Sequence, residues 1–111
     1  MFLMNLSFGI PVTIAYVAVD RTEDYGSPEE RTYGIVTADY THKSAFVQLQ
    51  DMMNRLTVMT FKERLPSDTA DYVFLFTSGS KKLLAAWTSS EAHDAAIDGG
   101  TVRLTSRSVY F

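Results

Sequence analysis

The pattern of apolar and polar residues predicts one long helix, at about residues 42–56. Apolar residues recur there every three or four positions, a spacing that places them on one helical face. This apolar stripe consists of Ala45, Phe46, Leu49, Met52, Met53 and Leu56. Thr41 precedes the helix and is expected to be its N-cap, because a threonine hydroxyl can accept a hydrogen bond from a free amide of the first turn.

A β-hairpin is the clearest strand pattern in the chain. Residues 71–77 and 82–88 are rich in aromatic and branched side chains, and the Ser-Gly-Ser sequence around Gly79 supplies the glycine that a tight turn favours. Shorter alternating runs predict strands at residues 57–65 and 101–106. The hairpin is therefore expected to be the centre of a sheet.

Other segments give weaker predictions. Residues 2–8 are expected to form the end of a helix stopped by Gly9 and Pro11. Residues 12–19 are apolar at nearly every position, which is typical of a strand covered on both faces. Residues 91–97 fit a short helix as well as a strand, and residues 108–111 are expected to add an edge strand.

These elements predict an α+β fold, an antiparallel sheet of about five strands with the helix at about residues 42–56 packed on it. The chain has 111 residues and is 46% hydrophobic, which suits a single domain, residues 1–111, with its own core. Its net charge of −3 and scattered basic residues argue against nucleic acid as a partner. Its apolar runs are too short to cross a bilayer, so no membrane partner is expected.

Three segments of the chain carry motifs that can be compared with a known family. They are FGIPVTIAY at residues 8–16, GIVTADYTHKSAF at residues 34–46 and YVFLFTSGSKKLLAAW at residues 72–87. In this order they resemble the C-terminal part of (β/α)8-barrel glycoside hydrolases: the eighth strand, the last β/α unit and the first hairpin of the β-sandwich that often follows. The resemblance implies a fragment of such an enzyme.

The chain departs from this family where catalysis is concerned. The tryptophan that commonly lines the sugar site of the family corresponds to Ala15. The catalytic carboxylates of these enzymes lie on earlier strands, and a complete barrel needs about 250 residues. We therefore expect no catalytic residue and no activity of the chain on its own; any activity would be that of a glycoside hydrolase.

Three residues are candidates for binding a ligand. Tyr16 and Trp87 could stack on a sugar ring, and Asp20 could bind a sugar hydroxyl or a cation. The alternatives are packing for Trp87 and a solvated loop for Asp20. His42 and His93, the only histidines, lack nearby cysteine or histidine and are expected to be polar surface groups, so no metal site and no cofactor are predicted.

Two functions follow from these observations. The first is a non-catalytic domain that resembles the C-terminal region of a glycoside hydrolase and acts by self-association as a homo-oligomer, because the strand at residues 12–19 needs neighbours. The alternative is a self-contained β-rich module that binds a carbohydrate or a peptide. An enzyme would require chains to build a site together, with Asp20 and Glu23 meeting across an interface.

Overall fold

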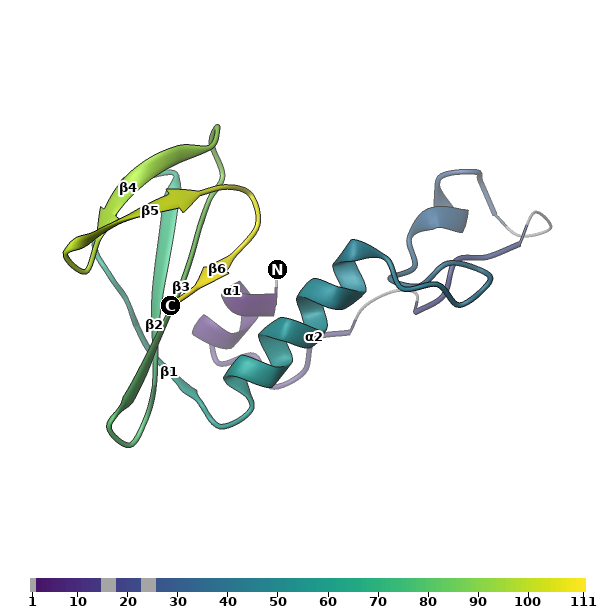
Figure 1. The fold of residues 1–111 in the computed structure, drawn as a ribbon. Coiled ribbons are helices and arrows are strands. Elements are labelled where there is room, and N and C mark those ends of the chain that lie inside the picture. The colour runs from purple at the N-terminus through teal and green to yellow at the C-terminus, as the bar shows by residue number, and fades with distance from the viewer. Residues whose placement is uncertain (1, 15–17, 23–25) are drawn as a thin grey trace. The chain divides into compact units, whose positions relative to one another are not determined.

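The computed structural model describes residues 2–14, 18–22 and 26–111, and the chain divides into two compact units. Unit 1 comprises Met1–Pro11 and Val58–Phe111, and unit 2 comprises Val12–Thr57. Figure 1 draws the helices and strands of both units. All of the named strands belong to unit 1, whereas the long helix belongs to unit 2.

The predicted hairpin is the centre of an antiparallel sheet in unit 1. The sheet has the order β1-β2-β3-β6, with bounds of Thr60–Arg64, Asp71–Ser78, Lys81–Thr88 and Val109–Tyr110. Gly79 forms the turn between β2 and β3 with φ of +57°, a conformation that glycine adopts without steric cost. The register of β1 against β2 shifts between Phe61 and Glu63, which marks a β-bulge at this edge.

A second sheet of two strands lies over one face of the first (Figure 1). It consists of β4, His93–Ile97, and β5, Gly100–Leu104, which are joined by a turn at Gly99 with φ of +79°. Residues 91–97 could have been helix or strand from their sequence. Residues 93–97 form a strand because pairing with β5 satisfies their backbone groups and turns Ile97 into the core.

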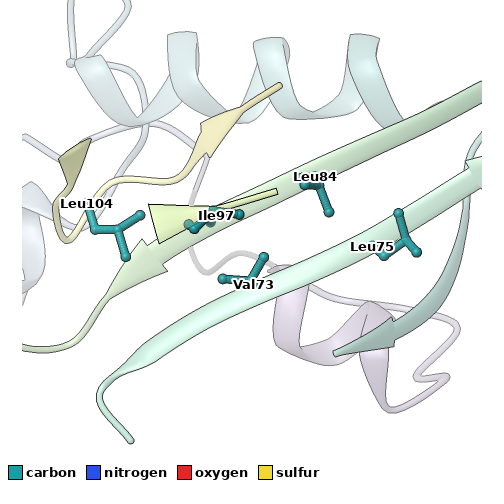
Figure 2. Close-up of a cluster of buried hydrophobic side chains, with 6 residues drawn as sticks. Val73, Leu75, Leu84, Ile97 and Leu104 are labelled. Carbon is teal, nitrogen blue, oxygen red and sulfur yellow. The ribbon is translucent and has the colours of Figure 1, made fainter. Parts of the chain in front are cut away.

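The main apolar core lies between these two sheets, as Figure 2 shows. Its buried members are Val73, Leu75, Leu84, Ala86, Ile97 and Leu104. Val73 faces Ala86 and Leu75 faces Leu84 across the hairpin, whereas Ile97 and Leu104 come from the second sheet. Full burial of one such leucine stabilises the fold by about 1.5–3 kcal/mol.

The opposite face of the hairpin is aromatic. Phe74 and Phe76 are only 1% exposed, and the ring of Phe61 on β1 meets both edge-on at centroid distances of 5.3 and 5.7 Å. Helix α1, Phe2–Ser7, also contacts β1 and buries Leu3. Both faces of the hairpin are therefore apolar.

The end of α1 agrees with its sequence. Gly9 has φ of +67°, and the amides of Phe8, Gly9 and Ile10 donate to carbonyls of the helix. The prediction of a helix stopped by glycine and proline is thus confirmed.

Unit 2 contains helix α2, Ser44–Leu56, and a short 3₁₀ helix, Glu30–Thr32. Val36 forms two isolated bridges, a parallel one with Val19 and an antiparallel one with His42. The middle of the strand predicted at residues 12–19 lies outside the described residues. Residues 12–14 are not in a strand, and Val19 makes only its single bridge.

The predicted N-cap of α2 is wrong. Lys43 occupies the N-cap position, with no hydrogen bond from its side chain to the first turn. Thr41 is engaged in a turn instead: its amide donates to the Thr37 hydroxyl at 3.0 Å, and its carbonyl accepts from the Thr37 amide at 2.9 Å. Thr41 is not the N-cap because its backbone groups are used in this turn with Thr37.

The α+β class is confirmed. The described residues contain six named strands, four in one sheet and two in the other, together with the predicted helix. The packing of α2 on the sheet stays a prediction, because the two lie in different units. Within the described ranges, no helix has the length and apolar character that a membrane span requires.

Removal of the Leu104 side chain should test the core between the two sheets. Leu104 is 0% exposed, so Leu104→Ala leaves a cavity and should lower the free energy of unfolding by about 2–5 kcal/mol. Urea unfolding followed by fluorescence of Trp87, the single tryptophan, measures this loss. The control is Val58→Ala, at a residue 69% exposed, which should change stability by less than about 0.5 kcal/mol. Equal losses in both variants would contradict this core.

Candidate functional site

Asp20, a predicted ligand residue, belongs to unit 2, and its carboxylate is hydrogen-bonded to other residues of that unit. Its Oδ1 atom accepts from the Lys43 ammonium at 2.6 Å and from the Gly34 amide at 3.0 Å. Lys43 also donates to the carbonyl of Thr32 at 3.0 Å. The Asp20 side chain is only 13% exposed, so its carboxylate ties together three segments of unit 2.

Gly34 is required in this arrangement because of space. A Cβ atom at this position would lie 2.4 Å from the backbone nitrogen of Asp20 and 2.8 Å from its Oδ1, well inside contact distance. The Asp20 amide donates to the Val36 carbonyl at 2.8 Å, which holds the two segments this close. We call this cluster of Asp20, Gly34 and Lys43 the Asp20 clasp.

Trp87, another predicted ligand residue, packs within the aromatic face of unit 1. Its ring stacks on Tyr72 at a centroid distance of 5.0 Å with 4° between the planes, and it meets Phe74 edge-on at 4.9 Å. The guanidinium of Arg64 lies over the other ring of the stack, 4.5 Å from the centroid of Tyr72. Trp87 and Tyr72 are both half-buried. Tyr16, the third candidate, lies outside the described residues.

The structure shows a pocket in unit 1 that the sequence did not suggest. Its volume is about 570 Å³, and it is lined by the segment before β2, by the start of β2, by β4 and by Leu104 of β5. Four aspartates line it, namely Asp68, Asp71, Asp94 and Asp98. His93 is the one side chain in the lining that can carry positive charge, so an anionic ligand is disfavoured.

Asp71 and His93 form an ion pair at this pocket. The Nε2 atom of His93 lies 3.0 Å from Oδ2 of Asp71, and its Nδ1 atom lies 2.9 Å from the backbone carbonyl of Glu91. The Asp71 side chain is 5% exposed, and its Oδ1 atom is buried with no hydrogen-bond partner among the described residues. The aspartate of this pair is therefore almost completely buried.

The surroundings shift the pKa of each partner. The nearby Thr88 hydroxyl has the largest effect in lowering the pKa of Asp71, burial opposes it, and His93 lowers that pKa further. The Thr88 hydroxyl also donates to the Ala70 carbonyl at 3.3 Å and lies 2.9 Å from the Ser90 hydroxyl. The pKa of His93 is raised, first by the Glu91 carbonyl and then by Asp71.

These properties limit the chemistry that the pocket supports. A general acid in glycoside hydrolysis needs a carboxyl group with a raised pKa. The carboxyl groups of the described residues that have a shifted pKa are Glu29, Asp39 and Asp71, and each of these pKa values is lowered instead. Of the three, Asp71 lines the pocket. Within the same residues, no group of three or more acidic or histidine side chains is arranged to hold a metal ion.

No sequence motif predicts the Asp71–His93 pair. The two residues are 22 positions apart and belong to no recognised motif. The prediction that residues 91–97 could be a strand was the one feature that pointed toward this pair. Such a strand would pair with residues 100–104 and bring His93 close to the sheet.

Comparison with known proteins supports the fold. No protein-family model and no curated protein sequence matches the chain. A similar solved structure is a family 39 glycoside hydrolase from the gut symbiont Bacteroides cellulosilyticus WH2, with a TM-score of 0.63 and 17% identity. The match covers 78% of this chain and 24% of that one, so the matched part of this chain spans about a quarter of that enzyme. The likeness shows a glycoside-hydrolase-like fold.

A methyl group at Gly34 should disrupt the Asp20 clasp. Gly34→Ala must separate the backbones of residues 20 and 34, at a cost of about 1–3 kcal/mol, the usual range for overpacking. Hydrogen exchange should show faster exchange of the Asp20 and Lys43 amides, which donate to Val36 and Ile35. Gly100→Ala is the control, because its Cβ meets its nearest atom at 3.8 Å, an ordinary contact. Unchanged exchange of both amides in Gly34→Ala would refute the clasp.

Proposed function

We propose that this chain is a non-catalytic region of glycoside-hydrolase architecture that acts by self-association. In this proposal unit 2 corresponds to the last β/α unit of a barrel, and unit 1 to the start of the β-sandwich that follows. The parallel bridge between Val19 and Val36, followed by α2, supports the first assignment, since parallel pairing and a following helix are features of β/α units. The two stacked antiparallel sheets support the second.

The observation that carries the proposal is the small amount of burial in unit 2. Among its residues whose burial is described, only Gly34 is fully buried. Helix α2 has an apolar stripe, yet Phe46, Leu49, Met52 and Leu56 on this stripe are only half-buried, and Met53 is 59% exposed. In a β/α barrel such a stripe is covered by the strands.

A second copy of the chain could cover the part of the stripe that is exposed. It would present the same parallel backbone segments and the same helix, so units from two copies can pack as neighbouring β/α units do. The 82% exposure of Ile14 and 67% exposure of Val12 add apolar surface to the same unit. Burial of such surface is the main source of free energy in stable association.

The state of the carboxylates supports the absence of catalysis. Asp20 is held by Lys43, Asp71 is held by His93, and the pKa of Asp71 is lowered. A lowered pKa keeps this carboxyl group ionised, so it is unsuited to protonate a leaving group.

A charge on the apolar stripe should weaken self-association. We expect the wild-type chain to have the molar mass of a dimer or a larger species by light scattering behind a sizing column. Leu49→Glu should raise the dissociation constant by about tenfold or more, because association would bury a charge. Gln48→Glu adds the same charge on the polar side of α2 and should leave the mass unchanged. Circular dichroism verifies that both variants keep their helix. A wild-type monomer at all concentrations would disprove the proposal.

A carbohydrate-binding module is the second candidate. The observation in its favour is the half-buried stack of Tyr72 and Trp87, since flat aromatic surfaces can hold sugar rings. Titration with soluble oligosaccharides should then change the fluorescence of Trp87, and Trp87→Phe should weaken binding by about fivefold or more. Binding can be followed in the variant by calorimetry. A flat titration across neutral and acidic oligosaccharides would eliminate this candidate.

A further inference from the structure

The ion pair between Asp71 and His93 connects the two sheets of unit 1. Asp71 is the first residue of β2 in the larger sheet, and His93 is the first residue of β4 in the smaller one. The 3.0 Å contact therefore joins the β4–β5 hairpin to the larger sheet at one end, while Ile97 packs in the core at the other end of β4. Both partners line the pocket.

The geometry favours a protonated His93. Its Nδ1 atom faces the carbonyl oxygen of Glu91 and its Nε2 atom faces a carboxylate oxygen of Asp71, and both of these atoms are acceptors. A neutral imidazole carries a single N–H group, so it can satisfy only one of them. The imidazolium carries two and satisfies both.

Loss of the proton leaves Asp71 in an unfavourable position. Its carboxylate is 5% exposed, and its Oδ1 atom already lacks a hydrogen bond among the described residues. A neutral imidazole can keep its one N–H group on Nε2 and still donate to Asp71, but the buried carboxylate then has no counter-charge, and the lone pair of Nδ1 faces the Glu91 carbonyl oxygen at 2.9 Å. Movement of the chain that admits water relieves this cost. The β4–β5 hairpin is the element that can move, because it is a separate two-stranded sheet. Its release also involves the 2.9 Å hydrogen bond from the Thr88 amide of β3 to the Thr105 carbonyl, directly after β5.

We propose that the Asp71–His93 pair is a pH-dependent latch, which fastens the β4–β5 hairpin while His93 is protonated and releases it, with the β4 side of the pocket, when His93 is neutral.

The charges around His93 favour the protonated state. On the segment before β2, Asp68 lies close enough to raise the pKa of His93, in addition to the larger effects of the Glu91 carbonyl and Asp71. On β4 itself, the neighbouring Asp94 carboxylate is paired with Arg103 of β5 at 3.2 Å.

Arg64, on β1, has a different role. Arg64 donates through Nη2 to the backbone carbonyl of Asp71 at 2.8 Å, and its guanidinium lies over Tyr72. These contacts fix the backbone of Asp71, whereas the Asp71 carboxylate is paired with His93. On β3, Thr88 is opposite Asp71 and is uncharged.

The direction of the pH effect follows from the two pKa shifts. The pKa of His93 is raised from 6.5, so its stabilisation is complete below that value and disappears as pH rises through the pKa in the folded state. The pKa of Asp71 is lowered from 3.8, so its stabilisation is present above that value and is lost as pH falls through its folded-state pKa. The latch is therefore fully closed between pH 3.8 and 6.5.

Two measurements on the full chain test the latch. NMR titration of the imidazole protons should give His93 a pKa above 6.5. Hydrogen exchange should show that protection of the β4–β5 amides, corrected for intrinsic exchange, is about tenfold or more lower near pH 8 than near pH 5.5, as expected for loss of a charge-assisted hydrogen bond. His93→Gln should abolish this pH dependence, because glutamine does not titrate.

The other histidine provides the control. His42 stacks on Phe46 in unit 2, and His42→Gln should keep the pH dependence of the β4–β5 amides. A His93 pKa at or below 6.5 in the wild-type chain would overturn the latch, even if His93→Gln failed to fold. Equal protection at both pH values, or a pH dependence that persists in a folded His93→Gln variant, would also overturn it.

Discussion

The hairpin of β2 and β3 is the constraint on which the rest of unit 1 depends. Its side chains alternate between two apolar faces, with Val73 and Leu75 toward the second sheet and Phe74 and Phe76 on the aromatic side. A hairpin with two apolar faces cannot remain exposed to water, so each face needs a cover. The β4–β5 hairpin covers one of them, and β1 and β6 extend the sheet at its two edges.

Unit 2 is held together in a different way. Its described contacts are mainly polar: the Asp20 clasp, the turn of Thr37 and Thr41 and the pair of Asp51 and Arg55 on α2. Polar contacts of this kind order a backbone but contribute little net stability when they are exposed. Such a unit gains more from an apolar partner than unit 1 does, and this difference is the physical basis of the proposed self-association.

The elements of the fold could be predicted where the signal was local. The hairpin, α1 and α2 follow from periodicity and from glycines at turns, and the structure confirms them. The candidate site could not be predicted, because its contacts join distant residues of ordinary type. The acidic loop predicted Asp20 as a ligand residue, yet its partner Lys43 lies 23 positions away. His93 contacts Asp71 only through the packing of two hairpins, which no local pattern predicts.

The bulge in β1 has a consequence for how chains can meet. β1 is one of the two edge strands of the larger sheet, and its register shifts between Phe61 and Glu63 while Lys62, Glu63 and Arg64 are exposed. An irregular, charged edge is a poor template for a strand from another molecule. This edge of the sheet is thereby protected against growth into fibrils by edge-to-edge addition, and the chain can be concentrated without extension of the sheet at this edge.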